Sequence, residues 1–63
     1  MGMIIIMGKE LQVGSGITIE QAVLDNGYHP DSFLYMIDGR PVPMDTVIED
    51  PAVVKAIRVA SGG

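Results

Sequence analysis

The chain has 63 residues, 48% of them hydrophobic, and a formal charge of −4 from eight acidic and four basic side chains. A chain of this length buries only about 60% of the surface that its unfolded form exposes, so we expect one small domain without an enclosed catalytic cleft. It has no cysteine, which excludes disulfides, a catalytic thiol and cysteine-ligated zinc. An acidic chain without a basic run disfavours nucleic acid as a partner and favours a protein with a basic surface.

Two apolar segments in the first part of the chain have the pattern of paired β-strands. Residues 3–7 form an apolar run that Gly8 ends, and residues 10–13 alternate polar and apolar side chains. We expect a β-hairpin with Leu11 and Val13 facing the core. The apolar run of five residues is far shorter than the roughly 20 residues that span a bilayer. With no targeting signal, we expect a cytoplasmic protein that has no membrane partner.

A short helix is predicted next. Thr18 and Gln21 have the spacing of a capping box, in which each side chain bonds to the other residue's backbone N–H. We expect the helix to run to about Asn26, with Gly27 as the left-handed residue that closes it and residues 28–32 as a connecting loop. Two turns are not stable alone, so the apolar stripe must pack on a sheet. That stripe consists of Ile19, Ala22 and Val23.

The second half of the chain predicts three further strands. Residues 33–37 are apolar on both faces, and the Asp38-Gly39 pair that follows favours a type I′ turn. A short strand over residues 40–42 is expected to pair back, at an edge of the sheet because its proline cannot donate a ladder hydrogen bond. After an irregular segment with one tight helical turn near Thr46, the last strand spans residues 53–60.

A single helix can close a core of this size by crossing one face of a mixed sheet. The long connection before the last strand allows the crossover that parallel pairing requires, so the first and last strands are expected to lie side by side in the middle. The predicted fold class is α+β, a β-grasp (ubiquitin-like) with a ββαββ mixed sheet and one crossing helix. Residues 1–60 form this domain, and residues 61–63 form a flexible C-terminal tail.

No group of side chains assembles a catalytic or metal site. The only histidine, His29, lies in the predicted loop without a ligand partner, and the serines lack the context of an activated nucleophile. Three acids lack the glycine-centred spacing of a calcium loop and are interpreted as a solvated turn; they are Asp45, Glu49 and Asp50. We therefore expect no enzyme activity, no metal and no bound cofactor.

The functional signal is the sequence Ser61-Gly62-Gly63 after the last strand. Glycine is costly to order, so we expect this tail to project about 10 Å from the sheet. An unhindered Gly63 carboxylate, with Ser61 and Gly62 behind it, suits a narrow channel in a partner. A free carboxylate is inert until a partner adenylates it with ATP, which would make this protein a substrate rather than a catalyst. The alternative is an ordinary frayed terminus.

Four segments of the chain resemble the ubiquitin-like β-grasp sulfur carriers and archaeal small modifier proteins, a family that includes thiamine-pathway (ThiS-like) and molybdopterin-pathway (MoaD-like) carriers. Residues 18–23 resemble the opening of the family's helix, and residues 54–63 its closing strand and tail. Residues 37–43 and 45–46 resemble its hairpin and the pair that follows. The chain departs from the family in Asp38, where Asn is usual, and in residues 50–52, where many members have Gly-Asp.

The resemblance implies a specific reaction at Gly63. A ubiquitin-activating-type enzyme would adenylate its carboxylate with ATP. A sulfur donor would then convert it to a thiocarboxylate for cofactor or tRNA thiolation by an acceptor enzyme. The second hypothesis is a covalent modifier joined through Gly63 to lysines of target proteins, and the third is a non-covalent interaction module.

An exposed apolar patch is expected on the sheet face that the helix leaves open. Residues 33–37 and 53–59 are apolar on both faces, and one helix covers only one of them. Such a patch usually marks a binding site, and we expect it to include Ile57 and Val59. Arg58 and Arg40 are expected at its rim. The sequence leaves open which side chains of residues 33–37 face outward. It also leaves open whether loops cover the apolar side chains or whether the chain dimerises through them.

Overall fold

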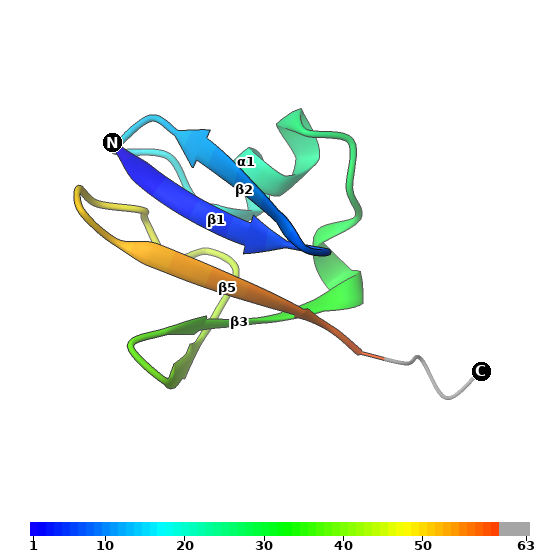
Figure 1. The fold of residues 1–63 in the computed structure, drawn as a ribbon. Coiled ribbons are helices and arrows are strands. Elements are labelled where there is room, and N and C mark those ends of the chain that lie inside the picture. Colours follow the sequence, from blue (N-terminus) through cyan, green and yellow to red (C-terminus); the bar gives the residue numbers. More distant parts are fainter. Residues whose placement is uncertain (60–63) are drawn as a thin grey trace.

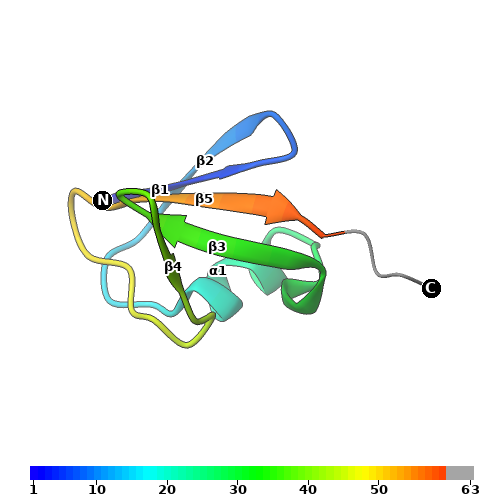
Figure 2. The ribbon, with the colours of Figure 1, turned by 90° about the horizontal axis from the view of Figure 1, so that it is seen from below.

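The computed structural model describes residues 1–59 as a five-stranded sheet with one α-helix packed on one face (Figure 1). Seen from below, the helix lies beneath the sheet and the opposite face stays open (Figure 2). The elements are β1 (Gly2–Ile6), β2 (Lys9–Val13), α1 (Ile19–Asp25), a 3-10 helix η1 (Pro30–Ser32), β3 (Phe33–Ile37), β4 (Arg40–Val42) and β5 (Val53–Arg58).

The strand order in the sheet is β2-β1-β5-β3-β4. β1 and β5 pair in parallel, and every other neighbouring pair is antiparallel. The parallel pairing of the first and last strands is therefore confirmed, as is the edge position of β4. The described order is ββαβββ, because β4 is the expected strand over residues 40–42, which the predicted ββαββ order did not count. This small α+β arrangement is compatible with a β-grasp.

The core lies between the sheet and α1. Alternate residues of β1 point into it, and Ile4 and Ile6 are completely buried. The predicted helix stripe and the inward side of the hairpin are confirmed, with Val13 buried and Leu11 partly buried. Ile48, from the irregular segment before β5, is also completely buried. Fully burying a side chain of this size contributes roughly 1.5–3 kcal/mol, so this segment is part of the core.

The helix begins as predicted but its capping is one-sided. The Thr18 hydroxyl accepts a hydrogen bond from the Gln21 backbone N–H at 3.1 Å. The Gln21 side chain donates forward to Asp25 at 2.8 Å instead of bonding back to Thr18, so only half of the capping box forms. The helix ends at Asp25, one residue before the predicted end, and Gly27 has the expected positive φ of 86°.

The tight turn predicted near Thr46 is present as a single hydrogen-bonded turn and does not continue into a helix. The Thr46 N–H closes a turn onto the Pro43 carbonyl at 3.1 Å, and Val47 forms an isolated bridge with Thr18. The Thr46 carbonyl accepts the N–H of Ile19 at 3.0 Å. The first N–H groups of a helix have no hydrogen-bond acceptor within the helix. The backbone after the turn is extended, and it provides such an acceptor for α1. Two other boundaries also differ, because β5 ends at Arg58 rather than at residue 60 and the expected loop 28–32 contains η1.

Replacing Tyr35 with Phe is expected to lower the free energy of unfolding by about 1–3 kcal/mol. The buried Tyr35 hydroxyl donates to the carbonyl of Pro30 at 2.7 Å, and Pro30 is itself buried. The Phe variant would leave that carbonyl without its partner. Urea unfolding of both proteins at neutral pH would measure the difference, and equal stabilities would contradict the role of this bond.

The same variant is expected to remove an alkaline loss of stability. Burial raises the pKa of the Tyr35 hydroxyl, and the carboxylates of Asp31 and Glu20 raise it further. The native state keeps this proton where the unfolded state ionises, so the contribution is complete below about pH 10 and is lost above it. Urea unfolding on both sides of that pH should show a steeper loss for the parent than for Tyr35→Phe, and parallel losses would contradict the assignment.

Candidate functional site

The face of the sheet that α1 leaves open lies in front of the helix in Figure 1, and it carries apolar side chains from β1, β3 and β5. The register places Leu34 of β3 opposite Ile57 of β5, and Met3 of β1 opposite Val53. Leu34 is 57% exposed, Ile57 48% and Val53 42%, so three of the exposed large apolar side chains of residues 1–59 lie together on this face. We call this surface the open-face patch; it consists of Met3, Ile5, Leu34, Met36, Val53 and Ile57.

The outward parity of β3, which the sequence left open, is settled by this register. Phe33 and Tyr35 are buried and pack in the core, so Leu34 and Met36 point away from the helix. Both faces of β3 are apolar, because one face packs in the core and the other belongs to the open side of the sheet. Ile57 lies on the open face as expected.

A shallow hollow of about 330 Å³ lies in the open-face patch beside the β3–β4 turn. Its apolar walls come from Met36, Val53 and Ile57, and its two charged groups are Lys55 and Asp38. Lys55 lies between Ile5 and Met36 in the register, so one cation sits within the patch. Glu10, opposite Ile5, lies on the same face, so the apolar area contains one cation and is bordered by two acids. An exposed apolar area of this kind usually marks a binding surface.

The structure does not bring Arg58 and Arg40 to the rim of the open-face patch. Successive residues of a strand point to opposite faces, so Arg58 lies on the helix side, opposite Phe33. Arg40 pairs with Ile37 at the far edge of the sheet and lines a different hollow. Val59 follows β5, is half-buried, and donates its N–H to the Ser32 carbonyl at 3.0 Å.

The tail that carries the predicted chemistry, Ser61, Gly62 and Gly63, lies outside the described residues. The structure describes the strand that leads to it. β5 is flanked by β1 on one edge and by β3 on the other, so the last described residues continue from a central strand. In the sequence, Ser-Gly-Gly begins two residues after Val59, the last described residue.

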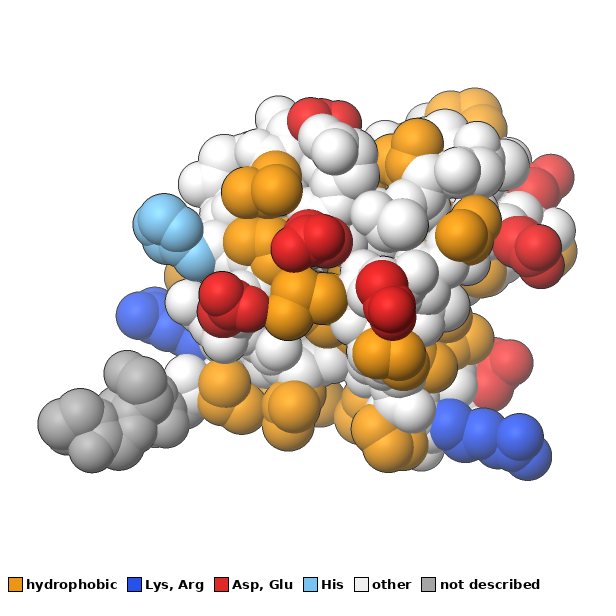
Figure 3. Space-filling model, turned by 180° about the vertical axis from the view of Figure 1, so that it is seen from behind, with side chains coloured by type: hydrophobic (Ala, Val, Ile, Leu, Met, Phe, Trp, Pro, Cys, Tyr) orange, Lys and Arg blue, Asp and Glu red, His pale blue; other side chains and the backbone are white. Residues whose placement is uncertain are grey.

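The helix side of the molecule differs in charge from the open face. Figure 3 shows this side, with acidic side chains distributed among apolar ones. Glu20, Asp25 and Asp31 are exposed in or beside its two helices. Within residues 1–59, no three His, Asp or Glu side chains gather in a way that could hold a metal ion.

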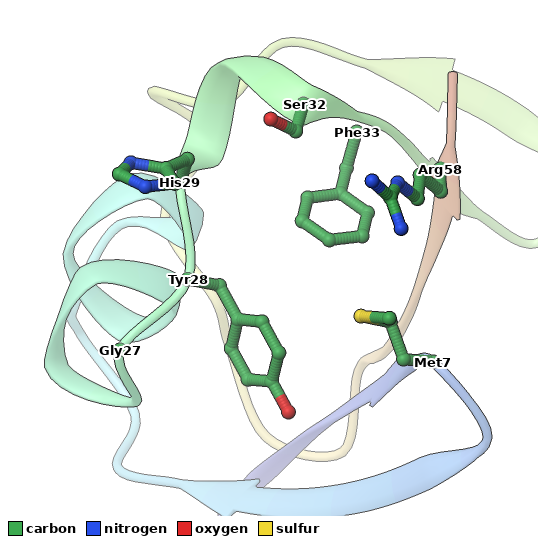
Figure 4. A pocket seen from close by; sticks show the side chains of 7 residues that line it. All are labelled: Met7, Gly27, Tyr28, His29, Ser32, Phe33 and Arg58. Carbon is green, nitrogen blue, oxygen red and sulfur yellow. The ribbon is translucent and has the colours of Figure 1, made fainter. Parts of the chain in front are cut away.

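Sequence reasoning missed a cavity at the end of β5, on the helix side (Figure 4). It is lined by side chains from the β1–β2 turn, the loop after α1, and β3 and β5. The segments are far apart in the chain, and no motif joins them. The one local indication in the sequence is Met7 directly before the turn glycine Gly8, where a hairpin turn usually has Asn or Asp.

Comparison with protein-family models finds no match for this chain, and comparison with curated proteins finds no significant match. In the part of the chain that the structure describes, no helix has the length and apolar character needed to cross a bilayer.

Proposed function

We propose that the protein is a β-grasp, ubiquitin-like sulfur carrier whose Gly63 carboxylate is adenylated by a ubiquitin-activating-type enzyme and converted to a thiocarboxylate. The thiocarboxylate would serve cofactor or tRNA thiolation. One observation carries the proposal: a central strand, parallel to β1 and paired on both edges, is followed after two further residues by the sequence Ser-Gly-Gly. The sheet order and the single crossing helix support the β-grasp assignment.

The proposed chemistry needs little from this chain beyond an accessible tail. The Gly63 carboxylate attacks the α-phosphate of ATP, which releases pyrophosphate and forms an acyl-adenylate. The terminal sulfur of a donor-protein persulfide then attacks the Gly63 carbonyl and displaces AMP, which forms an acyl disulfide. A second thiol of the donor cleaves the S–S bond, so that the thiocarboxylate leaves and the two donor thiols end as a disulfide. Gly62 and Gly63 have no Cβ to obstruct either approach. The activating enzyme supplies the ATP site, and the open-face patch offers it a surface to bind.

The alternative is a covalent modifier, which shares the first step. A lysine amine of a target protein would displace AMP and form an amide bond with Gly63. The third hypothesis, a non-covalent interaction module, uses the open-face patch alone and needs no reaction at Gly63.

Mass spectrometry of the protein isolated from its own cells under thiol-sparing conditions distinguishes the three hypotheses. We expect a species with one terminal oxygen replaced by sulfur. This change has the same nominal mass as oxidation of a methionine, of which the chain has five. Cleavage after Arg58 resolves the ambiguity, because the peptide of residues 59–63 contains no methionine. Gly63 joined to a foreign lysine would support the modifier, and only unmodified protein while thiolation is active would favour the interaction module.

Ile57→Asp is expected to weaken binding to the activating enzyme about tenfold or more while the domain stays folded. A charged side chain placed without a partner in an apolar contact costs about 1–3 kcal/mol or more of binding free energy. Ile57 lies in the open-face patch, opposite Leu34, and outside the core. Pyrophosphate exchange at increasing protein concentration would measure the binding, and thermal unfolding would measure the stability.

A buried residue of the same strand provides the control. Val54 lies on the same strand but is completely buried, so Val54→Asp is expected to unfold the domain. If Ile57→Asp also unfolds the protein, or if it folds and is activated normally, the open-face patch is not the surface that the activating enzyme binds.

A further inference from the structure

The cavity beside the end of β5 has the size of a site for one side chain. Its volume is about 190 Å³, below the roughly 300–1,000 Å³ of pockets that hold cofactors or small ligands. Met7, Tyr28, Ser32, Phe33 and Arg58 line it. Figure 4 shows the Met7 and Arg58 side chains pointing toward the space beside the two aromatic rings, and His29 pointing away from it.

The walls of this cavity are about equally polar and apolar and are partly open to solvent, and the apolar part is centred on two aromatic rings. The rings of Tyr28 and Phe33 meet edge to face, with centroids 6.2 Å apart and planes at 85°. Phe33 is buried, whereas Tyr28 is only half-buried. This fixed aromatic pair forms a rigid surface against which an apolar side chain can pack.

Met7 has a backbone conformation that its residue type disfavours. Its φ is 50° and that of Gly8 is 76°, the signs of a type I′ turn, in which Asn-Gly and Asp-Gly are preferred. The β3–β4 turn follows that preference with Asp38 at φ 53°. A long side chain at positive φ is strained, and Met7 is 55% exposed. Its own burial therefore does not compensate for the strain, whereas an adaptable thioether beside a binding cavity would give the residue a role.

Arg58 adds a positive charge at the cavity. It is exposed, and within residues 1–59 the one ion pair joins the Met1 amino group to Asp50, so no described carboxylate pairs with Arg58. The described residues that line the cavity include no acid, although the chain has eight. A planar guanidinium matches a carboxylate better than it matches other common side-chain groups.

We propose that this cavity binds an apolar side chain of a partner protein, and that an adjacent acidic residue of the partner pairs with Arg58. The apolar side chain packs against Tyr28 and Phe33, and Met7 adjusts around it. A partner in this position also touches Ser32, whose carbonyl accepts the N–H of Val59. It therefore contacts the root of the C-terminal segment. The proposal rests on the cavity alone and does not depend on the reaction proposed at Gly63.

The test is a titration of the full chain with capped tetrapeptides, in which binding is monitored by the NMR chemical shifts of the backbone amides. The probe is glycine-phenylalanine-aspartate-glycine, and its control carries asparagine in place of aspartate. We expect saturable shifts at Tyr28, Phe33 and Arg58, with the aspartate peptide binding about two- to fivefold more tightly, as an exposed ion pair allows. Shifts that do not saturate, or that centre on the open-face patch, would overturn the proposal.

Two variants separate binding at the cavity from folding. Met7→Asn relieves the strained turn, so we expect a higher thermal midpoint together with peptide binding weakened about fivefold or more. Arg58→Gln should make the aspartate and asparagine peptides equivalent, whereas Arg40→Gln, the same charge change at the far edge, should preserve the difference. Unchanged peptide binding by Met7→Asn, or equal behaviour of the two arginine variants, would contradict the proposal.

Discussion

Removal of Gly62 and Gly63 is expected to abolish adenylation while leaving the thermal midpoint nearly unchanged. The shortened chain would end at Ser61, whose Cβ and hydroxyl lie next to the new carboxylate. Ser61 would also hold that carboxylate two residues nearer to the sheet, which shortens its reach by about 7 Å. The buried core residues all lie between Ile4 and Val54, so the described core does not depend on the deleted pair.

ATP–pyrophosphate exchange with the activating enzyme measures the first effect, and a thermal melt measures the second. Ser61→Ala is the matched control, because it changes the tail but keeps both glycines and the length, and we expect it to be activated normally. If the shortened chain still supports exchange, Gly63 is not the acyl donor. If its thermal midpoint falls by many degrees, the tail contributes to the stability of the fold. The loss of exchange would then not identify Gly63 as the acyl donor.

The elements that sequence reasoning located correctly depend on local chemistry. The hairpin, the helix and β3 each follow from a side-chain period and a terminating residue within a few positions. Gly27 and the Asp38-Gly39 turn have the positive φ values that these residue types favour. The parallel pairing of β1 and β5 followed from the length of the connection, because parallel neighbours require a crossover.

The elements that sequence reasoning missed depend on partners far away in the chain. The segment around Thr46 is extended because its carbonyl groups accept the first N–H groups of α1, including Glu20 to Met44 at 2.9 Å. Gln21 donates from Nε2 to the Asp25 carboxylate, a charge-assisted hydrogen bond one turn away, instead of accepting the backbone N–H of Thr18. The first choice is not visible in a local window of sequence, whereas the second lies within four residues and competes there with the capping box.

The candidate docking surface could be predicted to exist but not mapped. Strands β3 and β5 are apolar on both faces, so the sequence alone does not tell whether Phe33 or Leu34 is buried. The structure selects Phe33 and Tyr35 for the core, where the Tyr35 hydroxyl finds the Pro30 carbonyl. That choice places Leu34 beside Ile57 and moves Arg58 to the helix side, where it meets Met7 and Tyr28 at the cavity.

Gly2→Ala is expected to lower the free energy of unfolding by about 1–3 kcal/mol, the range for overpacked cores. Gly2 is buried in β1, and a Cβ there would overlap Cγ2 of Ile48. Ile48 is completely buried, and its Cγ2 is held close to the backbone, so it has little freedom to move aside. In a domain this small, such a loss lowers the thermal midpoint by roughly 5–20 °C.

Two comparisons test this contact specifically. Gly14→Ala is the control glycine, because no atom lies within 4 Å of a Cβ built there, and we expect it to be neutral or slightly stabilising. Ile48→Leu removes Cγ2 while keeping the volume, so the double variant with Gly2→Ala should be less destabilised than the sum of the single variants, by about 0.5 kcal/mol or more. Strict additivity, or equal effects of alanine at Gly2 and Gly14, would show that the approach of Ile48 does not require a glycine in β1.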